Sequence, residues 1–73
     1  MMKPGDLVRP KFVPAWARSM DANENLVYTF LMCSDDVGVL IEPNSWAYYA
    51  KVLMRDQIVW VSESAIQVID EAR

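Results

Sequence analysis

The side chains that could perform chemistry are few in this 73-residue chain. Cys33 is its one thiol, and there is no histidine to activate that thiol as a nucleophile. Asp35 and Asp36 form an acidic pair, but a calcium site needs about six to eight oxygens from a longer, spaced loop. The sequence therefore predicts no enzyme, no metal site and no cofactor, and it indicates a structural cysteine beside an acidic turn.

The charge pattern bears on nucleic-acid binding. The net charge is −3 and the sequence pI is about 4.6, so the chain lacks the basic footprint that most nucleic-acid binders carry. Basic residues nevertheless gather in the first quarter, with Trp16 among them, and aromatic rings beside cations can stack nucleobases. One function to consider is therefore an accessory nucleic-acid-binding protein that uses Arg9, Lys11, Trp16 and Arg18.

Hydrophobic residues make up 53% of this short chain, with three tryptophans and five methionines among them. A domain of this size buries only about 60% of its unfolded surface, and one cysteine permits no internal disulfide. Either the core is unusually aromatic, or part of the apolar surface lies at an interface. We expect one domain over residues 1–73. It should be cytoplasmic, because no signal peptide or membrane span is visible and a single cysteine suits a reducing compartment.

The first third of the chain is expected to be mostly irregular. Pro4-Gly5 is a turn signal, and the short strand Leu7–Arg9 that follows should stop at Pro10. Residues 10–25 then read as a long loop. Within it, Pro14 suits the first position of a short helical turn over Ala15–Met20.

The segment Leu26–Met32 could be a strand or a helix. Asp21 and Glu24 have the spacing of a helix-capping box, whereas Val, Tyr, Thr and Phe favour a strand. A four-residue hairpin loop over Cys33–Asp36 would give a strand with one wholly apolar face. That hairpin pairs Met32 with Val37, Phe30 with Val39, and Tyr28 with Ile41, and we therefore predict a strand.

The rest of the chain reads as strands separated by turns. The expected elements are Val37–Glu42, Trp46–Met54, Gln57–Val61 and Ile66–Ile69, with a single 3₁₀ turn at Ser62–Ser64 before the last strand.

Two regions, Lys3–Arg9 and Val37–Ile69, resemble small SH3-like barrel proteins that are frequent in bacteriophages. The similarity rests on Lys-Pro-Gly-Asp-Leu-Val-Arg, Val-Gly-Val-Leu-Ile-Glu, Tyr-Ala-Lys-Val-Leu-Met, Val-Trp-Val and Ile-Gln-Val-Ile. The resemblance implies an all-β, five-stranded SH3-like barrel with a long first loop, encoded by a phage, and it carries no function with it. Residues 10–36 do not match, and Arg55-Asp56 stands where such proteins often have glycine.

The hairpin formed by Trp46–Met54 and Gln57–Val61 gives the strongest functional signal. A two- or four-residue loop places Leu53 opposite Ile58 and Lys51 opposite Trp60, and a three-residue loop shifts the partners by one. In either register both faces are apolar, whereas a half-exposed hairpin should alternate apolar and polar residues. Either the 11–36 segment covers the second face, or another molecule does.

These observations favour a non-enzymatic protein-interaction or assembly module. Its partner should be a second copy of the chain, forming a homodimer or higher oligomer, or another phage or host protein. The residues expected at the contact are Trp60, Tyr49, Leu53 and Ile58, joined by Trp16 or Trp46.

Overall fold

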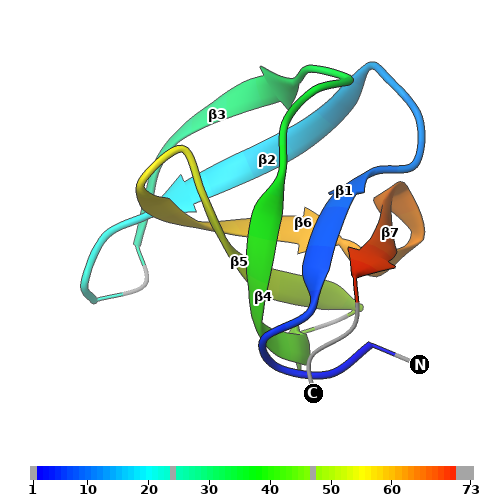
Figure 1. Ribbon diagram of the computed structural model, residues 1–73. Coiled ribbons are helices and arrows are strands. Elements are labelled where there is room, and N and C mark those ends of the chain that lie inside the picture. The colour runs from blue at the N-terminus through cyan, green and yellow to red at the C-terminus, as the bar shows by residue number, and fades with distance from the viewer. Residues whose placement is uncertain (1, 24, 47, 71–73) are drawn as a thin grey trace.

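The computed structural model describes residues 2–23, 25–46 and 48–70, without the side chains of residues 45 and 46. Within these ranges the chain is all-β, with seven strands and one 3₁₀ turn (Figure 1). The elements are β1 (Leu7–Pro10), β2 (Ala15–Met20), β3 (Leu26–Met32), β4 (Gly38–Trp46), β5 (Tyr49–Met54), β6 (Gln57–Ser62), η1 (Glu63–Ala65) and β7 (Ile66–Asp70). In this described part no helix is long and apolar enough to cross a membrane.

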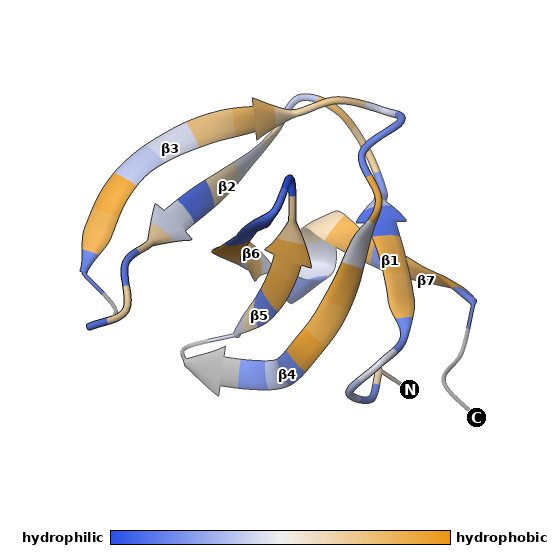
Figure 2. Cartoon of the chain, turned by 60° about the vertical axis from the view of Figure 1, so that its left-hand side comes forward, coloured by the Kyte–Doolittle hydropathy of each residue, from blue (hydrophilic) through white to orange (hydrophobic). Residues whose placement is uncertain are grey.

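The strands form a single antiparallel sheet in the order β3-β2-β6-β5-β4-β1-β7. The all-β prediction is confirmed, but the count of five strands is wrong. One additional strand is β2, which lies within residues 10–25, where a loop was expected. The other is β3, which was predicted as a strand but lies outside the regions that resemble the five-stranded barrel. The sheet curls, so that the β2–β3 hairpin arches over the other strands (Figure 2).

β2 corrects the predicted helical turn over Ala15–Met20. Ala15, Ala17 and Ser19 are buried, whereas Trp16 and Arg18 between them are exposed. This strict alternation has the period of a strand. Alanine is a strong helix former in isolation, but β2 pairs with β3 on one side and β6 on the other. The backbone hydrogen bonds that β2 makes to these two strands outweigh the helical preference of its alanines.

β3 is a strand as predicted, but its partner is different. It pairs with β2, in a register that sets Ala17 opposite Phe30. The three predicted pairs between residues 26–32 and 37–41 are therefore wrong. The turn at Cys33–Asp36 does form, with the Asp36 N–H donating to the Cys33 carbonyl at 3.0 Å. It carries the chain from β3 to β4, which pairs instead with β1 and β5.

Polar contacts hold the β2–β3 hairpin in place. Asp21 accepts hydrogen bonds from the N–H groups of Asn23 and Asn25, both at 2.9 Å, and so shapes its turn. The hydroxyls of Ser19 and Tyr28 both donate to Oε1 of Gln57, at 2.6 and 2.7 Å. One side chain at the start of β6 thereby ties β2 and β3 to the centre of the sheet.

The hairpin of β5 and β6 has the two-residue register. Leu53 lies opposite Ile58 and Lys51 opposite Trp60, as one of the two predicted alternatives required. The turn residues Arg55 and Asp56 have φ values of 53° and 59°. Positive φ at both central positions is the signature of a type I′ turn, whose twist matches that of the strands.

Two local predictions near the ends of the fold are confirmed. Pro4-Gly5 forms a turn, in which Gly5 has a φ of 93° that favours glycine. A single 3₁₀ turn precedes the last strand in the described chain, at Glu63–Ala65, one residue later than expected.

The core between the curled layers is small and aliphatic. Its largest fully buried apolar side chains are Leu40, Met54 and Ile66, followed by valines. Among the side chains that the structure describes, no aromatic ring belongs to the buried core. Of the two explanations offered for the apolar load, an unusually aromatic core is therefore wrong.

Candidate functional site

The alternation of β2, β5 and β6 places a set of large side chains on the outer face of the sheet. The inward residues of β5 and β6, among them Val52 and Val59, are fully buried. The residues between them therefore point outward, and the register sets Trp60 between Arg18 and Lys51. This outer face consists of Trp16, Arg18, Tyr49, Lys51, Leu53, Ile58 and Trp60.

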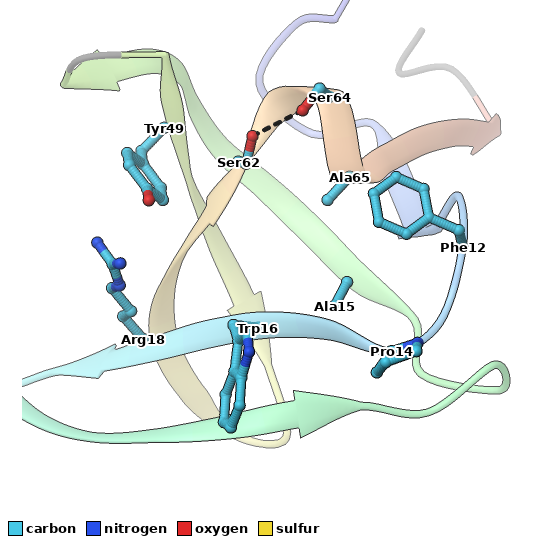
Figure 3. A pocket seen from close by; sticks show the side chains of 9 residues that line it. All are labelled: Phe12, Pro14, Ala15, Trp16, Arg18, Tyr49, Ser62, Ser64 and Ala65. Atoms are coloured by element: carbon cyan, nitrogen blue, oxygen red, sulfur yellow. Dashed lines mark hydrogen bonds between the residues drawn. The ribbon is translucent and has the colours of Figure 1, made fainter.

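A groove of about 320 Å³ opens at one end of this face. It lies between β2, the start of β5, and the segment that leads from β6 into η1 (Figure 3). The residues that line it are Phe12, Pro14, Ala15, Trp16, Arg18, Tyr49, Ser62, Ser64 and Ala65. The groove thus combines three aromatic rings, one cation and two hydroxyls.

A cation–π contact joins two sides of the groove. The guanidinium carbon of Arg18 lies 5.0 Å from the ring centroid of Tyr49. The two side chains point toward each other from β2 and β5, which lie on either side of β6 in the sheet (Figure 3). Such a contact holds the cation by the ring quadrupole and leaves its N–H donors available for an anionic group. Arg18 is accordingly the residue of the groove best placed to receive a carboxylate or phosphate.

The other aromatic rings of the groove face solvent. Trp16 is 60% exposed and Phe12 is 53% exposed. Phe12 belongs to the short connection between β1 and β2, which is fixed at its start because the Lys11 N–H donates to the Ala65 carbonyl at 2.7 Å. At the η1 side the hydroxyls of Ser62 and Ser64 share a hydrogen bond of 2.9 Å (Figure 3).

The residues expected at an interface are largely brought together. Trp16 and Tyr49 line the groove, while Leu53 and Ile58 form an exposed cross-strand pair, at 44% and 43% exposure. Trp60 is half-buried and lies opposite Arg18 of β2 on one side and Lys51 of β5 on the other. These five share the outer face, and the side chain of Trp46 lies outside the described residues.

Of the two alternatives for the second face of the β5–β6 hairpin, coverage by the 11–36 segment is not what the structure has. β2 extends the sheet edge to edge beside β6, which leaves Leu53 and Ile58 exposed. Phe12, Pro14, Ser62 and Ser64 were not among the residues predicted from the sequence, because they lie in connections or at the end of β6, where their positions depend on distant strands. In Ala-Trp-Ala-Arg-Ser, large residues alternate with small ones. This pattern could have predicted a strand whose large side chains face outward.

The four residues considered for nucleic-acid binding are only partly grouped. Trp16 and Arg18 lie in the groove, and the backbone of Lys11 is joined to Ala65 at its end. Arg9 is elsewhere, opposite Gln67 of β7. The structure thus brings Trp16 and Arg18 together, with Lys11 nearby. The four residues do not form a continuous basic surface.

The acidic turn has a structural role. Asp36 accepts hydrogen bonds from Nε and Nη2 of Arg55, at 3.0 and 2.8 Å, and from the Cys33 N–H at 2.6 Å. The hydrogen bond from Arg55 is the main cause that lowers the pKa of Asp36 below its ordinary value. Among the described residues no three acidic or cysteine side chains are grouped in a way that could hold a metal ion.

Comparisons with known proteins found no match: no protein-family model fits the chain, and no curated protein or solved structure is significantly similar to it.

Proposed function

We propose that this protein is a non-enzymatic interaction module of the SH3-like barrel type, encoded by a phage and acting in the host cytoplasm. The order of elements supports the fold assignment. A short β1 is followed by a long excursion, then by the meander β4–β5–β6, a 3₁₀ turn, and a last strand that returns beside β1. The excursion is the β2–β3 hairpin, which adds two strands to the five of the basic barrel: β2, where a loop was expected, and β3, which was predicted to be a strand.

The observation that carries the function is the position of the aromatic rings. A small domain without disulfides gains most from burying its largest apolar side chains, yet Trp16 and Phe12 of the groove are more than half exposed. Exposed aromatic rings that gather around a groove are typical of surfaces that bind another protein. We therefore place the binding site at the groove itself.

The chemistry of the groove defines the class of partner. Two exposed rings, Trp16 and Phe12, offer flat apolar surfaces, and Pro14 adds a third. Arg18, held against Tyr49, offers a cation. An extended peptide segment with apolar or proline side chains and one nearby carboxylate would match both the apolar surfaces and the cation. Such a segment also loses little conformational freedom on binding.

Selection from a library of random 12-residue peptides would test this function. We expect enriched sequences in which an acidic residue accompanies proline or large apolar residues, with dissociation constants in the micromolar range. Trp16→Ala should weaken binding at least about tenfold, the loss of one aromatic anchor. Leu53→Ala, on the same face but outside the groove, should change it little. No enrichment over a Trp16→Ala, Arg18→Ala double variant would contradict the proposal.

Accessory nucleic-acid binding remains the second candidate, favoured by one observation. Trp16 and Arg18 share the groove, and an exposed indole beside a guanidinium can stack a base and neutralise a phosphate. Fluorescence anisotropy with a 20-nucleotide oligothymidine at low salt distinguishes nucleic-acid binding from peptide binding. Tight binding that falls steeply with salt and is lost in Arg18→Ala would support this function over peptide binding.

A further inference from the structure

β3 lies at one end of the sheet, and no described strand pairs with its outer edge. It is seven residues long, Leu-Val-Tyr-Thr-Phe-Leu-Met, and has no charge and no proline. An edge strand presents a row of backbone N–H and C=O groups, and monomeric proteins usually protect it with lysines, prolines or short length. β3 has none of these three protections, and the irregularity in its pairing with β2 is confined to its first residues, Leu26 and Val27.

Most side chains of β3 are exposed as well, the exceptions being half-buried Phe30 and buried Met32. Leu26 and Val27 are 57% and 59% exposed, and Tyr28 and Leu31 are 47% and 45% exposed. The arch of β2 and β3 holds this edge away from the other strands (Figure 2). One side chain approaches β3 near its end. Nη2 of Arg55 donates a long hydrogen bond of 3.5 Å to the carbonyl of Leu31, the second-last residue of the strand.

The opposite edge of the sheet differs. β7 has five residues, of which Gln67 and Asp70 are polar or charged. A charged residue on a short edge disfavours pairing with another strand. The asymmetry between the two edges shows that the open character of β3 is particular to that strand.

We propose that β3 pairs with β3 of a second copy of this chain, antiparallel and about a two-fold axis at Thr29. In this register the opposed residues are apolar on both faces of the strand: Val27 lies opposite Leu31 of the other copy and Tyr28 opposite Phe30. Met32, at the end of the strand, is buried in the core of its own copy and makes no contact across the axis. The two Thr29 residues face each other.

A second copy is the occupant that the chemistry of β3 favours. Antiparallel pairing about a two-fold axis needs a strand that matches its own reverse. β3 meets this condition, because the two apolar residues on either side of Thr29 lie opposite apolar residues and no like charges are opposed. The interface leaves the groove of Phe12, Trp16 and Arg18 unused, so this inference does not depend on the proposed function.

The size of the contact sets the expected affinity. A strand edge buries less than the about 800 Å² per partner of a standard interface, which places this dimer in the weak class. We expect dissociation constants of tens to hundreds of micromolar, on the order of 10⁻⁵ to 10⁻⁴ M.

Sedimentation equilibrium of the full chain, from about ten micromolar to about one millimolar, tests the proposal. The wild type should pass from monomer to dimer in this range. Val27→Lys, which opposes a lysine to Leu31 of the other copy, should weaken dimerisation by at least about tenfold. Ile58→Lys is the matched control, since Ile58 is an exposed apolar residue on a central strand, and it should dimerise like the wild type.

Cross-linking tests the register itself. Residues opposite each other in antiparallel strands have Cα atoms about 4.5–5.5 Å apart, within the range of a disulfide. Thr29→Cys in a Cys33→Ser background should therefore form a disulfide-linked dimer under mild oxidation, and Ile58→Cys in the same background should not.

Three outcomes would overturn the proposal. The wild type could stay monomeric to about one millimolar. Ile58→Lys could abolish dimerisation while Val27→Lys does not, which would place the interface on the face of the β5–β6 hairpin. Cross-linking could be equal for the two cysteine variants. Circular dichroism of Val27→Lys, compared with that of the wild type, shows that a loss of dimer is not a loss of folding.

Discussion

The guanidinium carbon of Arg55 lies 4.2 Å from the ring centroid of Phe30, in a cation–π contact between the β5–β6 turn and β3. The same guanidinium forms a salt bridge of 2.8 Å with Asp36. Arg55 thus joins two connections that are distant in sequence, the type I′ turn and the Cys33–Asp36 turn. These contacts hold the arch of β2 and β3 against the rest of the fold.

Replacing Arg55 should loosen that arch. Arg55→Ala removes the cation–π contact and leaves Asp36 without its cation, so we expect the melting temperature to fall by several degrees. Arg55→Lys should fall less, since it keeps the charge and loses the planar fork. Thermal unfolding followed by circular dichroism measures both, with Lys11→Ala as the exposed-cation control. Equal melting temperatures for all three variants and the wild type would contradict this role.

Acid should destabilise the protein through Asp36. Its pKa is lowered in the folded state, chiefly by the hydrogen bond from Arg55, below the ordinary value of 3.8. A carboxyl with a lowered folded-state pKa stabilises the fold above its unfolded pKa, and that stabilisation is lost as the pH falls through the folded-state pKa. Urea midpoints should therefore decline as the pH falls below 3.8.

Asp36→Asn tests the source of this acid sensitivity. The variant should be less stable than the wild type near neutral pH, and its urea midpoint should decline less at low pH. Asp35→Asn changes the charge equally at the neighbouring, exposed position, and should retain the wild-type pH profile. If Asp36→Asn declined as steeply as Asp35→Asn, the acid sensitivity would have another source, such as Asp21, whose pKa is also lowered, mainly by the backbone of Asn25.

Gly38 should not tolerate a side chain. A Cβ at this position would collide with Cγ1 of Val52 and lie only 2.9 Å from the Leu53 carbonyl. Because the backbone on one side cannot move without disturbing β5, Gly38→Ala should cost about 1–3 kcal/mol of unfolding free energy. Denaturant unfolding measures the loss. Val37→Ala, at the adjacent exposed residue, should change stability by less than about 0.5 kcal/mol.

Asp56→Gly should stabilise the protein. Asp56 has a φ of 59° at the second central position of the type I′ turn, where glycine has no steric penalty and is the preferred residue. We expect a gain of about 0.5–1 kcal/mol, limited by the greater freedom of glycine in the unfolded chain. Asp56→Ala is the matched variant that keeps a Cβ, and it should be less stable than the wild type. A loss of stability in Asp56→Gly, measured by urea unfolding, would contradict the assignment of the turn.

Features that depend on neighbours in the chain could be predicted from the sequence. The turn at Pro4-Gly5, the 3₁₀ turn before the last strand, and the hairpin of β5 and β6 each follow from residue types within a few positions. Turn chemistry and the two-residue period of strands are local properties. The same local logic placed Trp16, Tyr49, Leu53 and Ile58 among the candidate interaction residues.

Features that depend on distant partners were decided only by the tertiary structure. Nothing in Leu26–Met32 distinguishes β4 from β2 as its neighbour, because both offer apolar residues in alternation. The inward residues of β2 are alanine and serine, which locally resemble a helix or a loop. They fit because β2 lies between β3 and β6, where Ala17 meets Val61 in the closely packed core. The groove likewise exists only because this pairing brings Trp16 and Arg18 to Tyr49 and η1.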